Sequence, residues 1–437
     1  MNVILIVADT WRRDHMSCYG NPHVRTPHLD ELTKRSAVFD NAWCGSYSTL
    51  PHRNDVITGR YDFPWRGWCS PGAGERTLPG LLGQAGKSSF LVTDTYHHWA
   101  KGTSTFWWDF TGFEFIRGQE RDPWISDTDM RVKYPAPEYK ETGSITPHLR
   151  MMRTRSREED WSPAQVFLRA SFWFHHNTQL KDSFLMVDVF DPHEPWDPPR
   201  KYSRVFENAD YEGNEYVSPS SRPVAGYLSD AEFRHVKALY SGEVSLVDRW
   251  IGHLIKQVHG KGALENTLVI VTSNGGVLLG EHGLVGKDHA LYQDLARVPL
   301  IVWHPKLGHG RRIGQLVQPV DILPTVLDAA GVPAPDDVHG RSLLPLLEEA
   351  PPAAWRETAL FGRHGQWCNL TDGRYVLHGN LETGVKCLFD IQRDPGESKD
   401  LASTDPSQLQ RMEALLAAKL REIHAPATLI ERLAPNA

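Results

Sequence analysis

The sequence predicts an α/β protein with a large, mostly parallel sheet that helices cover on both faces. Short apolar runs rich in β-branched residues recur along the 437-residue chain, and helical patterns lie between several of them. Strands that are apolar along their whole length are typical of parallel sheets, because both of their faces are buried. The predicted strands are Val3–Val7, Ser89–Thr93, Phe184–Val189, Leu268–Thr272 and Val298–Trp303.

Local signals predict two of the helices. Residues 229–232 read Ser-Asp-Ala-Glu, which has the form of a capping box, and apolar residues then recur at helical spacing as far as Val258. Gly260 and Gly262 end this long helix. A second helix is predicted from about Ile322 to Ala330.

The last part of the chain predicts a small α+β subdomain. A proline-rich junction at Glu349–Ala354 separates a main α/β domain, residues 1–350, from a C-terminal subdomain, residues 351–437. Within the main domain, the polar and aromatic stretch 118–165 predicts either a lid or insertion beside the site or an ordinary surface excursion. The subdomain's predicted elements are three short antiparallel strands and a final helix, at Thr358–Phe361, Tyr375–His378, Lys386–Asp390 and Ser407–His424.

Composition excludes some function classes. The chain has 47 Lys and Arg against 54 Asp and Glu, a formal net charge of −7, which argues against a dedicated nucleic-acid-binding protein. Its apolar runs are far shorter than the roughly 20 residues of a membrane span. The N-terminus shows no signal-peptide pattern and the five cysteines are scattered, so we expect a cytoplasmic protein with free thiols and no membrane partner. A homo-oligomer is compatible with the same composition.

Chemically active side chains gather where the predicted strands end. In an open parallel sheet, ligands bind beyond the carboxyl ends of the strands. We therefore expect one site there, with a small anionic substrate as its ligand. The residues that follow the predicted strands are Asp9 and Thr10, then Asp94, His97 and His98, then Asp191, His193 and Glu194, and finally Ser273, Asn274, Glu281, His282, Lys287 and His289.

Motifs spread over nearly the whole chain resemble the sulfatase branch of the alkaline phosphatase superfamily. They include Asn2–Arg12, Thr26–Leu32, Leu50–Arg53 with Thr58–Tyr61, Asp191–His193, Gly280–Leu284 with Gly286-Lys287, and Leu388–Asp390 with Asp394–Glu397. The resemblance implies an alkaline-phosphatase-like fold, with residues 1–350 as the catalytic domain. It also implies a hydrolase that acts on a sulfate, phosphate or phosphonate ester.

The nucleophile position departs from the family pattern. The family signature is Cys or Ser, any residue, Pro, Ser and Arg, and true sulfatases oxidise its first residue to formylglycine. Aligned on Pro51 and Arg53, this chain has Thr49 at the nucleophile position and His52 in place of the serine. A secondary hydroxyl would oxidise to a ketone, so we expect no formylglycine and a threonine nucleophile that needs an adjacent base or metal. The alternative is a buried or helix-capping Thr49.

The metal ligands depart as well. The family holds a divalent cation with acidic residues after the first strand and an Asp-His or Asp-Asn pair after a late strand. The matching positions here are Asp9, Thr10 and Asn274, with Gly275 following Asn274. One carboxylate with neutral oxygens is a weak ligand set for Mg²⁺ or Ca²⁺, and zinc prefers His or Cys, so we expect an impaired metal site. Asp9 could instead only cap a turn.

By the same resemblance, the residues that face the substrate are kept. Arg53 would orient the nucleophile position, and His97, His193 and Lys287 would contact the transferring group and the leaving oxygen. Cations and imidazoles around a tetrahedral anion stabilise its charge, and a histidine can protonate a departing oxygen. The alternative for Arg53 is a structural ion pair. The remaining predicted substrate-binding residues are His52, His98, His282 and His289.

Three functions fit this sequence. The first is ester hydrolysis, with Thr49 as the nucleophile or as a residue that positions water. The second is a metal-independent enzyme that uses the His, Lys and Arg pocket for another reaction on an anionic substrate. The third is a non-catalytic protein that binds an anionic metabolite or a protein partner.

Overall fold

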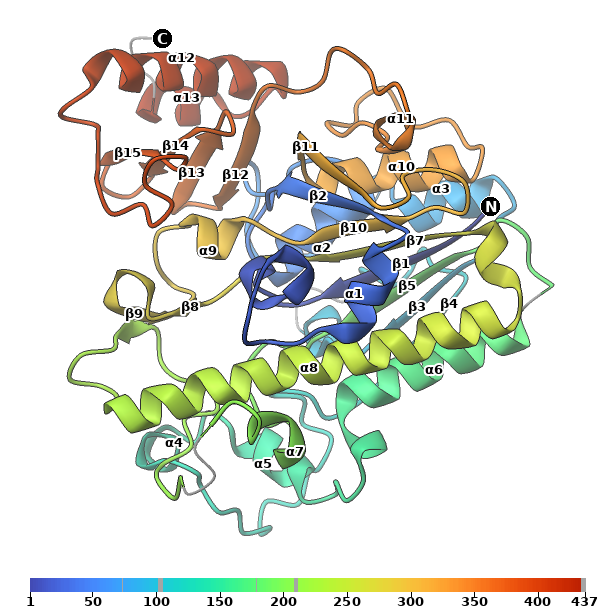
Figure 1. Cartoon of the computed structure of the whole chain (residues 1–437), viewed down its shortest axis with the longest axis vertical. Helices are drawn as coiled ribbons and strands as arrows, with labels where there is room; N and C mark the ends of the chain where they lie inside the picture. Colours follow the sequence, from blue (N-terminus) through green and yellow to red (C-terminus); the bar gives the residue numbers. More distant parts are fainter. Residues whose placement is uncertain (73, 101–104, 178, 208–210, 434–437) are drawn as a thin grey trace.

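An eight-stranded, mostly parallel sheet forms the centre of the molecule (Figure 1). The computed structural model describes residues 1–437 except 73, 101–104, 178, 208–210 and 434–437. The strand order is β11-β2-β10-β7-β1-β5-β3-β4, and β10 runs antiparallel to both of its neighbours. The strands are β1 (Asn2–Ala8), β2 (Ala37–Ala42), β3 (Ser89–Thr93), β4 (Gly112–Phe115), β5 (Phe184–Val189), β7 (Thr267–Ser273), β10 (Leu300–Trp303) and β11 (Arg311–Val317). The predicted mostly parallel sheet is confirmed.

Helices cover both faces of this sheet, as predicted. Alternate residues of β1 enter opposite core clusters, with Val3, Leu5 and Val7 in one and Ile4, Ile6 and Ala8 in the other. Figure 1 shows the long helices α8 and α6 lying side by side across one face. That face is covered by α1 (Pro27–Thr33), α6 (Ser162–His176) and α8 (Asp230–Gly260), and the opposite face by α2 (Thr49–Thr58), α3 (Leu78–Gln84) and α10 (Ile322–Ala329).

The capping box of the long helix is confirmed. Ser229 Oγ accepts a hydrogen bond from the backbone N–H of Glu232 at 3.3 Å, and Glu232 Oε2 accepts from the backbone N–H of Ser229 at 2.9 Å. Helix α8 ends at Gly260, where the sequence predicts its end. None of the helices in the described ranges combines the length and the apolar stretch that are needed to cross a membrane.

A four-stranded antiparallel sheet follows near the C-terminus. It joins the main sheet through the loop before α2, because the backbone N–H of Tyr47 donates to the carbonyl O of Gly362 at 2.8 Å and that of Gly362 donates to Gly45 O at 2.9 Å. The end of β12 thus lies beside the start of α2. The elements are β12 (Ala359–Arg363), β13 (Trp367–Thr371), β14 (Tyr375–Asn380), β15 (Lys386–Asp390), α12 (Pro406–Glu422) and α13 (Ala427–Leu433), of which β13 and α13 were not predicted.

Shorter elements complete the fold. A small sheet has the order β6-β9-β8, and the stretch 118–165 contains α4, α5, a 3-10 turn at Glu158–Asp160 and the first residues of α6. The remaining strands are β6 (Arg222–Pro223), β8 (Leu278–Leu279) and β9 (Leu284–Gly286), and the remaining α-helices are α4 (Pro137–Thr142), α5 (Thr146–Met152), α7 (Arg200–Ser203), α9 (Gln293–Ala296) and α11 (Leu344–Leu347).

Candidate active site

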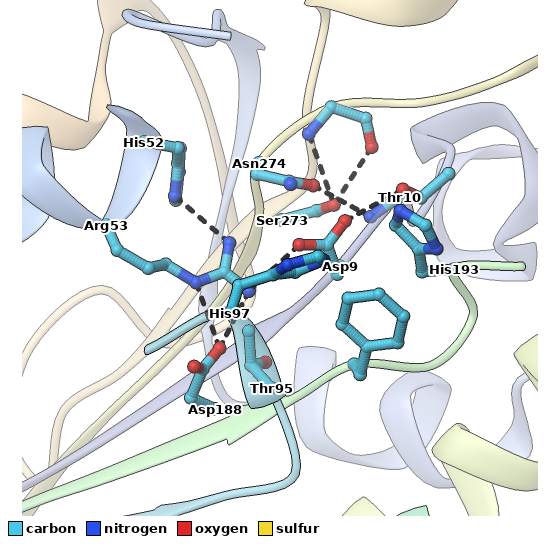
Figure 2. A network of polar contacts seen from close by, with 12 residues as sticks. Asp9, Thr10, His52, Arg53, Thr95, His97, Asp188, His193, Ser273 and Asn274 are labelled. Carbon is cyan, nitrogen blue, oxygen red and sulfur yellow. Dashed lines mark hydrogen bonds and ion pairs between the residues drawn. The ribbon is translucent and has the colours of Figure 1, made fainter. Parts of the chain in front are cut away.

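Three fully buried charged residues lie at the carboxyl end of the parallel strands (Figure 2). Asp9 follows β1, Asp188 lies in β5, and Arg53 lies in α2. The Arg53 guanidinium donates through Nε and Nη2 to Asp188 Oδ1, at 2.9 and 2.7 Å. Its Nη2 also lies 3.2 Å from Asp9 Oδ2. The chain therefore holds a cation of its own between two buried carboxylates.

Positive charge keeps both of these carboxylates ionised. Burial by itself would raise the pKa of Asp9, but the charges of Arg53, His193 and Lys287 outweigh burial and hold this pKa below its ordinary value. Burial would likewise raise the pKa of Asp188, and the charge of Arg53 lowers it below its ordinary value. Arg53, Asp9 and Asp188 therefore form a buried cluster of ionised groups at neutral pH.

His98 supports Asp188 from behind. Its Nε2 lies 2.8 Å from Asp188 Oδ2, its ring stacks on Phe106, and Thr93 Oγ1 donates to the same carboxylate oxygen at 3.0 Å. Burial lowers the pKa of His98 more than Asp188 raises it, which fits a neutral ring that donates its Nε2–H. Because His98 is fully buried, the structure places it on Asp188 rather than at a ligand-facing position.

The turn after β1 is strained and tightly held. Thr10 has a φ of 58°, in the left-handed region that β-branched residues rarely adopt. Its backbone N–H donates to Asn274 Oδ1 at 2.7 Å, its Oγ1 donates to Asp9 Oδ1 at 2.8 Å, and its carbonyl accepts from Tyr240 Oη at 2.8 Å. Such strain persists only where the surroundings fix the conformation. These hydrogen bonds direct Asp9 toward Arg53.

Two of the predicted metal ligands, Asp9 and Asn274, each accept a hydrogen bond through Oδ1. Asp9 accepts from the Thr10 hydroxyl and faces the Arg53 guanidinium, and Asn274 Oδ1 accepts from the backbone of Thr10. In the part of the chain that the structure describes, no three His, Cys, Asp or Glu side chains are arranged to hold a metal ion. A guanidinium beside the one carboxylate of the set would repel a divalent cation, so these residues do not fit one.

The position after Asn274 is closed to any side chain. A Cβ added to Gly275 would lie 2.5 Å from Cε2 of Tyr47 and 2.9 Å from the carbonyl O of Leu295. The Tyr47 ring, which is 3% exposed, therefore fills the space into which a ligand at position 275 would project.

Replacing Gly275 by alanine tests this closure. We expect Gly275→Ala to lower the free energy of unfolding by about 1–3 kcal/mol, because the added methyl overlaps the Tyr47 ring and a backbone carbonyl. Urea unfolding measures the change. Gly83→Ala in α3 is the matched control, since its Cβ would meet no atom within 4 Å. Equal stability of the two variants would show that position 275 has room for a side chain.

Lys287 and His193 bring further positive charge to Asp9. Lys287 Nζ lies 3.0 Å from Glu194 Oε1 and donates to Thr10 Oγ1 at 3.4 Å. His193 Nδ1 lies 2.6 Å from the carbonyl O of Glu194. Because a carbonyl oxygen only accepts, Nδ1 carries the hydrogen, and Nε2 is the nitrogen that can exchange a proton with a ligand.

His97 lies in the same site as Arg53 and is surrounded by aromatic rings (Figure 2). Its Nε2 lies 3.0 Å from Glu120 Oε2, and its ring contacts those of Phe190 and Trp68. Phe190 also stacks on His193 with ring centroids 4.1 Å apart, so one aromatic ring separates the two histidines. The Glu120 carboxylate comes from the stretch 118–165.

Thr49 is the first residue of α2 and is 1% exposed. Its neighbours Ser48 and Pro51 line a cavity of about 330 Å³ that Lys287 also lines. A helix N-terminus favours anions, because its first backbone N–H groups have no partner within the helix. The cavity's other lining residues are Tyr47, Gly67, Trp68, Asp288, Arg363, His364 and Gln366.

The C-terminal sheet contributes to this cavity through Arg363, which the sequence analysis missed. Arg363 Nη2 donates to the carbonyl O of Lys287 at 2.8 Å, Nη1 lies 3.1 Å from Asp288 Oδ1, and the guanidinium stacks over the Tyr47 ring at 4.9 Å. The strand-end rule applies within one parallel sheet, and Arg363 belongs to the other sheet. Nothing in the sequence therefore indicated that Arg363 lies near Lys287. For Asp188, which was also missed, a charge inside an apolar strand was the available signal.

Three of the predicted substrate-binding histidines contact other groups. His52 is fully buried, its Nδ1 lies 3.4 Å from Arg53 Nη1, and burial together with the Arg53 charge lowers its pKa to about 3. His282 stacks on Tyr292, with ring centroids 3.6 Å apart. His289 Nε2 lies 3.0 Å from a backbone carbonyl.

Comparison with known proteins identifies the family. The Sulfatase family model matches residues 1–332, and a model described as N-sulphoglucosamine sulphohydrolase, C-terminal, matches residues 280–426. An arylsulfatase from Clostridium perfringens is 23% identical, over 97% of this chain and 94% of that protein. An N-acetylglucosamine-6-O-sulfatase from Bacteroides thetaiotaomicron is 25% identical, over 92% of this chain and 82% of that protein.

Solved structures share the fold. The phosphonate monoester hydrolase of Agrobacterium radiobacter has a TM-score of 0.77 at 21% identity, over 98% of this chain and 97% of that one. A protein solved in complex with its substrate D-glucosamine-2-N,6-O-disulfate has a TM-score of 0.77 at 21% identity, over 97% of this chain and 98% of that one. Since the family model covers far more than half of its length, the chain belongs to the sulfatase family.

Proposed function

We propose that this protein hydrolyses an ester of sulfate, phosphate or phosphonate at the N-terminal end of α2. The observation that carries the proposal is the gathering of Lys287, His193 and Arg53 around Asp9, with Lys287 also lining the cavity beside the first turn of α2. Positive groups fixed around one point stabilise the charge of a tetrahedral anion and of its transition state. The family to which the chain belongs supports the same class of reaction.

In the reaction that we propose, Thr49 Oγ attacks the sulfur or phosphorus and the bond to the leaving oxygen breaks. The hydroxyl proton passes to a base or to water, and His193 as imidazolium gives its Nε2 proton to the leaving oxygen. Lys287 neutralises charge on the transferring group. Water then hydrolyses the threonine ester and restores Thr49.

The positive charge that assists this reaction comes from side chains in our proposal. Arg53 balances Asp9 and Asp188, and Lys287 lies 3.4 Å from Thr10. We derive no step through a divalent cation, because Asp9 and Asn274 accept hydrogen bonds and position 275 is closed. In this proposal the metal site is impaired because Asp9 and Asn274, which would be its ligands, bind groups of the protein itself.

The cavity beside Ser48 and Pro51 is the place for the organic part of the ester. Its volume of about 330 Å³ suits a single ring, and Trp68, which is 48% exposed, offers an apolar face beside it. Solved relatives act on a glucosamine disulfate and on phosphonate monoesters. Sulfated glucosamine, aryl sulfates, phosphate mono- and diesters and phosphonate monoesters are therefore the compounds to test.

Substitution of Thr49 tests the proposed nucleophile. We expect turnover of at least one compound of this panel in the presence of EDTA, and a loss of roughly 10³-fold or more in kcat/KM for Thr49→Ala. Thr49→Ser keeps a hydroxyl and should retain part of the activity. Thr142→Ala, at an exposed helix position, serves as the control.

Other outcomes separate the alternatives. Unchanged turnover in Thr49→Ala would show that Thr49 is not the nucleophile. Saturable binding of sulfate or phosphate esters without turnover of any of them would favour a non-catalytic anion-binding protein. Turnover that disappears in EDTA and returns with one divalent cation would contradict the use of Arg53 and Lys287 in place of a metal.

A further inference from the structure

A buried pair of carboxyl groups lies under the turn that carries His193. Glu243 of α8 and Asp191, at the start of the turn, are 0% and 2% exposed, and their carboxyl groups lie within hydrogen-bonding reach of each other. Two ionised carboxylates have no hydrogen to donate and repel each other, so this contact requires a shared proton. The proposed reaction uses neither group.

Glu243 also holds the far end of the same turn. Its Oε1 accepts a hydrogen bond from the backbone N–H of Asp197 at 2.8 Å. One side chain from α8 therefore contacts the first and the last residue of the turn 191–197. His193 and Glu194 lie between these two contacts, and Glu194 pairs with Lys287.

The surroundings favour the protonated form of the pair. Burial raises the pKa of Asp191 to about 7, and burial together with the neighbouring carboxylates raises that of Glu243 well above its ordinary value. Gln119 Nε2 donates to Asp191 Oδ1, so this oxygen already has a partner. The other titratable or charged groups near the pair are Asp94, whose carboxylate accepts from the backbone of Phe190, and Asp197 with its partners His148 and Arg155.

We propose that Glu243 is a positioning residue of the active site, which in its protonated form fixes the turn 191–197 and thereby sets the place of His193 and Glu194 beside Lys287. This inference rests on the proposed function, in which His193 protonates the leaving oxygen. Glu243 contacts no substrate in this role. When the pair loses its shared proton at alkaline pH, the two carboxylates separate and the turn loosens.

Replacing Glu243 by glutamine tests this role, because the glutamine amide resembles the protonated carboxyl group at every pH. Its Nε2 can donate to Asp191 and its Oε1 can accept from Asp197, but it has no proton to lose. For Glu243→Gln we expect kcat/KM at pH 6 within about twofold of the native value, and a loss between pH 7 and pH 9 that is about fivefold smaller than the native loss. Glu243→Ala, which makes neither contact, should lose about tenfold or more at every pH.

Asp248→Asn is the matched control on the same helix. Asp248 is buried, accepts hydrogen bonds from the backbone of His28 and Leu29, and has a pKa that burial raises to about 7. These hydrogen bonds join it to α1 and not to the turn, so its substitution should alter the pH dependence of unfolding and leave the pH profile of kcat/KM unchanged. Coincident pH profiles of the native protein and Glu243→Gln would overturn the proposal.

Amide hydrogen exchange separates this proposal from the proposed function. At a single pH of 7, residues 191–197 should exchange faster in Glu243→Ala than in the native protein or Glu243→Gln, because the Asp197 N–H loses its acceptor. Faster exchange without turnover of any ester would refute the proposed function and keep the positioning role. Unchanged exchange in Glu243→Ala would refute the positioning role at any level of activity. If Glu243→Ala does not fold, the pH profile of Glu243→Gln decides.

Discussion

Replacing Arg53 by alanine is expected to destabilise the protein by about 3–5 kcal/mol and to abolish turnover. The reason is the pair of carboxylates that the guanidinium separates. Asp9 and Asp188 are both fully buried, and without Arg53 each would lose the guanidinium that lies beside it and neutralises its charge. Urea unfolding at pH 7, with activity measured on the same preparations, checks both expectations.

The pH dependence of this loss has a definite sign. Because the pKa of Asp188 is lower in the folded than in the unfolded protein, its ion pair contributes stability above about pH 4. This contribution disappears as the pH falls through the lower folded-state pKa. The difference in unfolding free energy between the native protein and Arg53→Ala should therefore be largest at neutral pH and shrink below about pH 4.

Two further variants show whether the loss in Arg53→Ala comes from the buried ion pairs. Arg53→Lys keeps the charge but loses the paired Nε and Nη2 contacts to Asp188, so an intermediate loss is expected. Arg312→Ala removes an exposed arginine that pairs with Asp40, and should change stability by no more than about 1 kcal/mol. If Arg53→Ala were no worse than Arg312→Ala, the buried cluster would not be ionic.

Uniformly apolar runs made the centre of the sheet predictable. The predicted strands match β1, β3, β5, β7 and, within two residues, β10, whose side chains are buried on both faces. The missed strands of the main sheet carry polar residues. β2 contains Asp40 and Asn41. The edge strands β11 and β4 expose one face, so their sequences mix polar and apolar residues and lack a continuous apolar run. The missed β13 has the same cause, with Asn369 in its middle.

The site was predictable as far as the strand-end rule reaches. That rule places Asp9, His193 and Lys287 together, and the structure brings all three into electrostatic contact. It could not show that Arg53 would lie between two carboxylates, since that depends on how α2 packs on the sheet. Nor could it show that a tyrosine ring fills the space beside Gly275, because the clash joins residues more than 200 positions apart.

Lys287→Ala is expected to reduce kcat/KM by roughly 10²–10³-fold while changing the free energy of unfolding by no more than about 1 kcal/mol. Lys287 differs from Arg53 in its surroundings, because its side chain is 14% exposed and its partner Glu194 is 21% exposed. Water can therefore take over part of the solvation of Glu194 when the ammonium group is removed. A loss of activity at nearly native stability would separate the charge that meets the substrate from the charge that holds the fold.

Lys386→Ala is the control for this variant, because Lys386 is about as exposed as Lys287 and also pairs with a glutamate. Lys386 is 19% exposed and pairs with Glu413, which is 18% exposed, so Lys386→Ala removes an equally covered ion pair outside the site. It should leave kcat/KM unchanged. Lys287→Arg restores the charge with a bulkier, planar group and should recover only part of the activity, since the compact ammonium fits between Glu194 and Thr10. Full activity of Lys287→Ala would remove Lys287 from the proposed mechanism and leave His193 as the proposed contact to the transferring group.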